Sequence, residues 1–228
     1  MKEWDLLNET IIACRKCPRL VNYREAIART KRRAYQDQDY WGKPVPGFGD
    51  QHARVVVVGL APGAHGSNRT GRMFTGDASG EFLYRALYKA GLANQPTATS
   101  RDDGLELSGI FITAICRCAP PDNKPSTLEA ANCLGYLSSE LALLGKVDGL
   151  VALGRFALDW SLNLYRSMGN PFPPVEFRHG GFTPASGDRP WLLTSFHPSR
   201  QNTQTGRLTE AMFDSIWMTV ANYLHKTP

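Results

Sequence analysis

The sequence predicts an α/β fold, a three-layer α/β/α sandwich around a central, mostly parallel sheet of four strands. Four short apolar runs are separated by helical patterns, and continuous apolar runs are typical of strands that helices cover on both faces. The length of 228 residues suits one domain, so we expect residues 1–228 to form a single unit. The four expected strands are Val55–Gly59, residues 110–115, Gly149–Leu153 and Trp191–Ser195.

The first half of the chain is expected to form two helices, a loop, a strand and a further helix. Residues 4–13 and 18–34 have helical patterns, and the turn between them reads Cys-Arg-Lys-Cys. Residues 35–53 are rich in glycine and proline, which predicts a surface loop. The first strand leads through a long loop to a helix over residues 81–90, and residues 92–108 are polar and expected to be loop.

The second half alternates strands and helices. A proline turn at residues 120–125 precedes Ser126 and Thr127, which can cap a helix over residues 128–144. Gly154 follows the third strand and opens a helix that reaches about residue 164. Residues 168–190 contain a candidate edge strand at residues 175–177, and a loop that begins at His197 leads to a closing helix over residues 208–224.

Composition and charge narrow the class of protein. No apolar run approaches the roughly 18 residues that span a bilayer, and the N-terminus lacks a signal-peptide layout, so we expect a cytoplasmic protein. No coiled coil or long apolar patch is present, and we expect a monomer.

The formal net charge is +5. A basic stripe suits nucleic acid, with a solvated helix face as the alternative; it comprises Arg15, Lys16, Arg19, Arg24, Arg29, Lys31, Arg32 and Arg33.

The loop after the first strand is the richest in candidate functional groups. Ligands of open α/β sheets bind beyond the carboxyl ends of strands, so we expect the site here. Between residues 55 and 80 the chain holds six glycines. It also holds the polar residues His65, Ser67, Asn68, Arg69, Thr75 and Asp77.

The cysteines indicate a metal or cluster site. In a cytoplasmic chain five cysteines favour metal binding over disulfides. Cys14 and Cys17 form a CxxC, while Cys118 and Cys133 flank the start of one helix, so four thiolates can hold zinc or an iron–sulfur cluster. Cys116 competes with Cys118 for the third position, and its apolar neighbours favour a core role. Thiols that bind nothing are the alternative.

Four motifs occur in order along the chain: GLAPGAHG and FTGDASG in the loop after the first strand, RCAPPDNKP after the second strand, and HPSRQNTQTGRLT after the fourth. Together they resemble the uracil-DNA glycosylase superfamily, and the cysteines resemble its iron–sulfur branches, families 4 and 5. Family 4 carries Glu where this chain has Leu60, and Asn where it has Ala114. Both departures resemble family 5, whose members are described as tolerating a broader range of bases.

The resemblance implies a monofunctional DNA-repair glycosylase. Such an enzyme would excise uracil and other deaminated or modified bases, such as hypoxanthine and xanthine, and leave an abasic site. It also implies a structural [4Fe–4S] cluster that staples the N-terminal helices to the domain. Its ligands would be Cys14, Cys17, Cys118 and Cys133, because Cys118 matches the cysteine that directly precedes the Pro-Pro turn in the family.

Glycosidic cleavage leaves positive charge on the sugar and negative charge on the base, which assigns roles to the candidates. Asp77 is the nearest acid that can stabilise the cation and orient water, with a helix N-cap as the alternative. His197 can donate a hydrogen bond to the departing base. Asn123 resembles a loop residue near the pocket that binds base or water.

Base binding and DNA binding are assigned to further loop residues. Phe74 is the expected stacking platform, with an ordinary core phenylalanine as the alternative. The remaining base-binding candidates are Gly59, Ala61, Pro62, Gly63 and Ala114. Phosphate and groove contacts are expected from Arg69, Arg72, Ser199, Arg200, Gln201 and Arg207.

Other functions remain open from the sequence. A narrow, family 4-like uracil glycosylase is the nearest rival, and Ala114 argues against it. A non-catalytic nucleic-acid-binding module held by zinc would explain why Leu60 replaces an acid. A nucleotide-phosphate hydrolase is disfavoured because the glycine-rich loop lacks GxxxxGK[ST].

Overall fold

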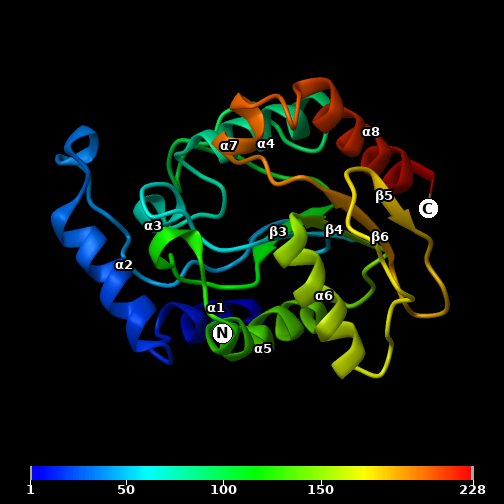
Figure 1. The fold of residues 1–228 in the computed structure, drawn as a ribbon, viewed down its shortest axis with the longest axis horizontal. Helices are drawn as coiled ribbons and strands as arrows, with labels where there is room; N and C mark the ends of the chain where they lie inside the picture. The colour runs from blue at the N-terminus through cyan, green and yellow to red at the C-terminus, as the bar shows by residue number, and fades with distance from the viewer. Residues whose placement is uncertain (1, 227–228) are drawn as a thin grey trace.

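The computed structural model describes residues 2–226, which form one mixed sheet between two helical layers (Figure 1). The sheet has six strands in the order β1-β3-β2-β4-β6-β5. Its centre is parallel, with Val57 of β2 opposite Ile112 of β3 and Val151 of β4. The four central strands are β2 (Val55–Gly59), β3 (Ile110–Ala114), β4 (Gly149–Leu153) and β6 (Trp191–Ser195), as the sequence predicts.

Two short antiparallel edge strands, β1 (Phe48–Gly49) and β5 (Gly181–Thr183), complete the sheet, so its predicted four-strand width is corrected to six. The prediction of an edge strand at residues 175–177 is wrong. Val175 and Phe177 instead pack against the core under helix α6, and their apolar character comes from this role. The strand that pairs with β6 begins a few residues later, at Gly181.

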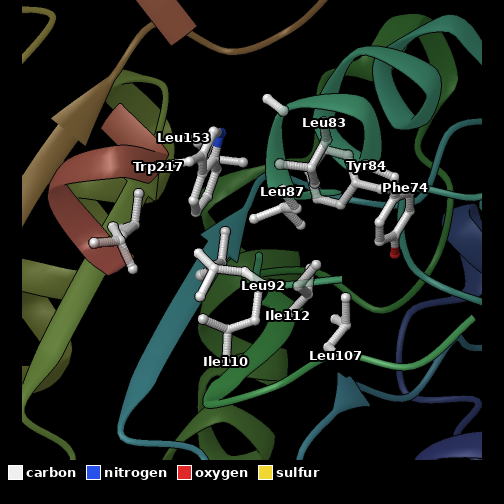
Figure 2. Packing of buried hydrophobic residues seen from close by; sticks show 14 of the residues in the cluster. Phe74, Leu83, Tyr84, Leu87, Leu92, Leu107, Ile110, Ile112, Leu153 and Trp217 are labelled. Atoms are coloured by element: carbon white, nitrogen blue, oxygen red, sulfur yellow. The ribbon is translucent and has the colours of Figure 1, made fainter. Parts of the chain in front are cut away.

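Helices cover both faces of the sheet. On one face lie α4 (Ala78–Lys89) and α8 (Glu210–Lys226), and on the other lie α1 (Glu3–Ile12), α5 (Thr127–Leu144) and α6 (Arg155–Ser167) (Figure 1). Successive residues of a strand point to opposite faces. Val55 and Val57 therefore join the core under α4 and α8, while Val56 and Val58 join the core on the α5 side. Figure 2 shows the first of these cores, where Leu83 and Leu87 meet the strand residues.

Local capping chemistry explains where several helices begin and end. Ser126 accepts from the backbone N–H of Glu129, and the Glu129 side chain accepts from Ser126 in return, which confirms the predicted cap of α5. Asp77 caps α4, so this helix begins three residues before the expected residue 81. Helix α2 (Pro18–Thr30) ends earlier than expected because Lys31 adopts a φ of 52°.

Short elements that the sequence does not predict lie close to the carboxyl edge of the sheet. They are α3 (Ser67–Thr70), α7 (Arg200–Gln204), and two 3₁₀ turns, Arg33–Tyr35 and Pro121–Asn123. In the part of the chain that the structure describes, no helix is both long and apolar enough to cross a membrane. The candidate site is built by the loops that follow β2, β3 and β6.

Candidate functional site

A cleft of about 560 Å³ lies where the parallel strands end. Leu60 follows β2, Ala114 ends β3 and His197 comes two residues after β6, and all three line the cleft. This is the edge at which the sequence predicts ligand binding. Asp77 and Asn123 also line the cleft, so the three predicted catalytic residues come together there.

The two carboxylate oxygens of Asp77 have different surroundings. Oδ1 accepts from the Gly80 backbone N–H at 3.0 Å and caps α4, which confirms the N-cap that the sequence offered as the alternative. Oδ2 lies against the backbone of Gly63 and Gly66, since a Cβ built on these residues would be 2.8 and 1.9 Å from it. Burial raises the pKa of Asp77, against the smaller effect of the backbone hydrogen bonds. The glycines of the loop thus allow a carboxylate to sit deep in the cleft wall.

His197 is held from its backbone, while its ring faces the cleft. The Asn202 side-chain amide donates to the His197 carbonyl at 2.8 Å, and the Ser199 backbone N–H donates to the same oxygen at 2.8 Å. Burial among protein atoms lowers the pKa of His197 to about 4, so the imidazole is neutral at physiological pH. Within residues 2–226 no hydrogen bond occupies its ring nitrogens. A neutral imidazole N–H is therefore available to a bound ligand.

Phe74 belongs to both the core and the cleft. Its ring centroid is 5.8 Å from that of His197, and the two planes are 30° apart. Its φ of 51° is unusual for a residue with a side chain, and neighbouring glycines permit it. A Cβ on Gly80 would be 1.7 Å from the Phe74 carbonyl, and one on Gly59 would be 2.9 Å from the ring. Phe74 therefore packs in the core, as the alternative prediction had it, and it also lines the cleft, while its stacking on a base stays a prediction.

The cleft wall contains only some of the residues that were predicted to bind a base. Ala61, Gly63, Phe74 and Ala114 line the cleft. Gly59 and Pro62 do not, because the Phe74 ring covers Gly59 and Pro62 is buried behind the wall.

Asn123 lies in an unusual turn at the cleft. It and its neighbour Asp122 have φ values of 55° and 54°, so two adjacent non-glycine residues are left-handed. Both side chains are exposed and line the cleft. Such conformations cost roughly 1–3 kcal/mol each and concentrate at functional sites. The turn therefore presents Asn123 to the cleft at an energetic cost.

Two of the expected DNA contacts are corrected by the structure. Arg72 is 3% exposed, and its guanidinium makes two 2.8 Å hydrogen bonds to the carboxylate of Asp103. Arg69 is 8% exposed; it donates to the carbonyls of His65 and Gly76, and its guanidinium stacks on Tyr35. Neither guanidinium is free for a phosphate, so both arginines are structural.

The remaining DNA candidates lie at the surface beside the cleft. Ser199, Arg200 and Gln201 line its mouth at the start of α7. Arg207 is exposed, with its guanidinium 4.6 Å from the centroid of the Phe196 ring. These side chains can reach a nucleic acid that enters the cleft.

The N-terminal basic stripe is partly neutralised within the protein. Arg15 pairs with Glu25 and Arg19 with Glu129. Arg24 is buried at 2% exposure, so it cannot contact a polyanion at the surface.

The cysteines come together as predicted. Cys14, Cys17, Cys118 and Cys133 line one cavity between the N-terminal helices and the start of α5. Cys116 does not line it; its side chain is fully buried in the core under α5, next to Cys133, which raises its pKa. Burial raises the pKa of Cys17, and it raises that of Cys118 to about 12. The pKa of Cys133 is instead lowered to about 6, first by the hydrogen bond from the Cys116 thiol.

The donors of this cavity are of the kind that bind metal through sulfur. Soft thiolates select zinc, copper(I) or iron–sulfur clusters. In residues 2–226 no three His, Cys, Asp or Glu donors are grouped tightly enough to ligate a single ion. Arg117 also lines the cavity, and its Nε and Nη1 are buried without hydrogen-bond partners. An anionic group in the cavity could accept hydrogen bonds from these two nitrogens.

Some residues of the cleft wall were not predicted from the sequence. They share a position beside predicted residues in the same loops, which is the signal that could have identified them. These residues are Met73, Ala78, Ser79 and Asp122.

An α/β sheet with a polar cleft at its carboxyl edge defines a class of proteins that bind a small planar or anionic group there. The family model described as "Uracil DNA glycosylase superfamily" matches residues 46–221. A type-5 uracil-DNA glycosylase of Thermus thermophilus is 52% identical over 210 residues, which cover 92% of this chain and 93% of that protein. One of Mycobacterium tuberculosis is 50% identical over 213 residues, or 92% of this chain and 78% of that protein.

A type-4 uracil-DNA glycosylase of Pyrobaculum aerophilum is more distant, at 34% identity over 149 residues, or 65% of this chain and 59% of that protein. The chain therefore belongs to the uracil-DNA glycosylase superfamily, and within it to the type-5 uracil-DNA glycosylases. The resemblance drawn from the four motifs and from Leu60 and Ala114 is confirmed.

Proposed function

We propose that this chain hydrolyses the N-glycosidic bond between uracil and deoxyribose in DNA. Water adds to the anomeric carbon, and the base departs with the bonding electron pair and gains a proton, which leaves an abasic site. The observation that carries the proposal is the presence of Asp77 and His197 on one cleft, beside an aromatic ring. In such a reaction a carboxylate stabilises the positive charge that develops on the sugar, and a neutral N–H donor stabilises the negative charge on the departing base.

The roles follow from the surroundings of each group. The Asp77 carboxylate stabilises the sugar cation and orients the attacking water. The neutral imidazole of His197 donates a hydrogen bond to the base oxygen as charge develops there. Phe74 stacks against the flipped base, and Asn123 binds the base edge or the water. Flipping costs a few kcal/mol, least at a mispaired base.

We also propose that the chain accepts other deaminated bases, such as hypoxanthine and xanthine. Leu60 and Ala114 present no hydrogen-bonding side chain to the base, so the cleft tests little of the base edge. A site that hydrogen-bonds its substrate closely rejects analogues strongly, whereas an apolar wall discriminates weakly. A monomeric state and a cytoplasmic location stay predictions beside this one.

The test is strand cleavage by alkali after incubation with oligonucleotide duplexes. Each duplex carries uracil, hypoxanthine, xanthine or an undamaged base at one position. The wild type, Asp77→Asn, His197→Ala and Glu81→Gln are compared. Glu81 is the matched acidic control, since it is exposed in the first turn of the same helix.

We expect Asp77→Asn and His197→Ala each to lose about 10²-fold or more in rate and still bind DNA, because a positioned catalytic group contributes about 10²–10⁴-fold. Glu81→Gln should retain wild-type activity. No cleavage of any substrate by the wild type would overturn the enzymatic proposal, and the zinc-held binding module would replace it. Cleavage at uracil alone would remove only the broad base range.

We further propose that Cys14, Cys17, Cys118 and Cys133 hold a structural [4Fe–4S] cluster. Each thiolate of such a cluster binds a different iron, and the four cysteines of the cavity supply that number of ligands. The support is their common cavity, and Cys116→Ala is the matched control because Cys116 lies outside it. Protein purified without oxygen should be brown and contain about four irons per chain; iron should fall in Cys118→Ala and not in Cys116→Ala. Colourless, zinc-loaded protein would refute the cluster.

A further inference from the structure

Arg117 lies between Cys116 and Cys118, and its side chain forms part of the wall of the cysteine cavity. It is 1% exposed, so water cannot satisfy its guanidinium. Only Nη2 has a partner, the Glu140 carboxylate at 2.6 Å. Nε and Nη1, which carry three of the five guanidinium N–H groups, make no hydrogen bond among the described residues. A buried donor without a partner costs roughly 1–3 kcal/mol, so this arrangement calls for an acceptor.

Glu140 orients Arg117 but does not account for the free donors. It is 1% exposed, and Oε2 also accepts from the Thr113 hydroxyl at 2.7 Å, while Oε1 accepts from the Gly47 backbone N–H at 3.3 Å. A bidentate guanidinium pair would use both carboxylate oxygens. Here the Glu140 oxygens are shared with Thr113 and Gly47, so Arg117 bonds through one nitrogen and keeps its other edge free.

A second arginine flanks the same cysteines. Arg24 is 2% exposed; its Nη1 and Nη2 donate to the carbonyls of Gly42 and Cys14, and Nη2 also lies 3.7 Å from the Glu25 carboxylate. Its Nε has no hydrogen-bond partner among residues 2–226. Two buried guanidinium groups therefore stand beside four thiols. Four thiolates with a doubly charged metal core carry a net charge of about −2, so these guanidinium groups favour such a centre, although Glu140 and Glu25 offset part of their charge.

We propose that Arg117 donates N–H···S hydrogen bonds to an anionic metal–sulfur centre held by the four cysteines, with Arg24 as a second compensating cation. The inference rests on the cysteine centre proposed above and not on the glycosylase activity. Hydrogen bonds to cluster or ligand sulfur stabilise the more negative form, so they set the reduction potential and the retention of the metal. Glu140 then acts as the residue that positions Arg117.

The test uses full-length protein purified without oxygen, with Arg117→Met, Arg117→Lys and Arg72→Met. Arg72→Met is the matched control: it breaks another buried arginine–carboxylate pair, which lies outside the cysteine cavity. The midpoint potential is followed by absorbance during reductive titration with dithionite. Iron release to a ferrous chelator is timed separately, and thermal unfolding reports the fold.

We expect Arg117→Met to lower the midpoint potential and to release iron about 10-fold faster or more, as losses of outer contacts to metal sites do. Arg117→Lys should fall between it and the wild type, and Arg72→Met should match the wild type in both. If Arg117→Met does not fold, Arg117→Lys decides: the ammonium keeps the positive charge but loses the planar set of guanidinium donors, so the midpoint potential should still fall below that of the wild type.

Unchanged potential and iron release in Arg117→Met, or in Arg117→Lys where Arg117→Met does not fold, would overturn the proposal and leave Arg117 as a counter-ion of Glu140. Iron-free wild-type protein would overturn it as well. Each of these results is independent of uracil release, which is measured on the same preparations. Failure of this inference is therefore distinguishable from failure of the proposed activity.

Discussion

Gly66 determines whether the Asp77 carboxylate can reach its place in the cleft. A Cβ on Gly66 would be 1.9 Å from Oδ2 and 2.6 Å from Cγ of Asp77. An ordinary contact is about 3.4 Å, so Gly66→Ala forces the carboxylate to retreat by about 1.5 Å. Misplacement of a catalytic group by about 1 Å can cost about 10²-fold in rate. We therefore expect Gly66→Ala to lose about 10²-fold in kcat with no change in any charged residue.

Two further glycines turn this into a graded experiment. A Cβ on Gly63 would be 2.8 Å from Oδ2, so Gly63→Ala requires a shift of only about 0.6 Å and should lose less activity. Gly135 is exposed within α5 and has no atom within 4 Å of a new Cβ, so Gly135→Ala should keep full activity and gain up to about 1 kcal/mol in stability. Single-turnover rates on a uracil duplex and thermal melts measure both effects. Equal rates for Gly66→Ala and the wild type, with both proteins folded, would refute the mechanism through Asp77.

Four other predictions follow from single contacts. Burial lowers the pKa of His197 to about 4 and raises that of Asp77. We therefore expect kcat/KM to stay constant as the pH falls through 6.5 and to decline only nearer pH 4, and a midpoint at pH 6.5 would contradict this. Loss of the Asn202 amide in Asn202→Ala should lower kcat about 10-fold, and exposed Gln204→Ala on the same helix should not. Asp103→Ala leaves buried Arg72 unpaired and should cost about 3–5 kcal/mol in chemical unfolding, against less than about 0.5 kcal/mol for exposed Asp102→Ala. If Arg200 contacts a phosphate, Arg200→Gln should reduce the slope of log Kd against log salt by about 0.9, and Lys146→Gln, near the opposite edge of the sheet, should not.

The central fold was predictable because its signals are local. Each parallel strand is a continuous apolar run, and the capping motif of Ser126 and Glu129 marks the start of α5. The edge strands were missed because β1 and β5 span two and three residues, too few for a periodic pattern. Phe177 was misassigned for a related reason: an apolar residue that covers a core looks the same in sequence as one in an edge strand.

The site was predictable in its members but not in their contacts. The carboxyl edge of a parallel sheet collects the residues that follow each strand, so Asp77, Asn123 and His197 could be grouped without a structure. The pairing of Arg72 with Asp103 joins residues 31 positions apart through a loop, and nothing local distinguishes such an arginine from one that faces DNA. The left-handed φ of Phe74 was equally hidden, since it depends on Gly80 allowing the close approach of a carbonyl.

The position of the acid within the loop has a consequence for base selection. A carboxylate at position 60, directly after β2, would stand on the wall that Leu60 and Ala114 form in this chain. Asp77 instead enters from the cap of α4, with one oxygen fixed by the Gly80 N–H and the other against Gly63 and Gly66. The carboxylate is thus held by backbone and makes no demand on the wall at positions 60 and 114. The wall can therefore stay apolar and accept several bases while the acid keeps its position. This is possible because Leu60 and Asp77 lie at opposite ends of one glycine-rich loop.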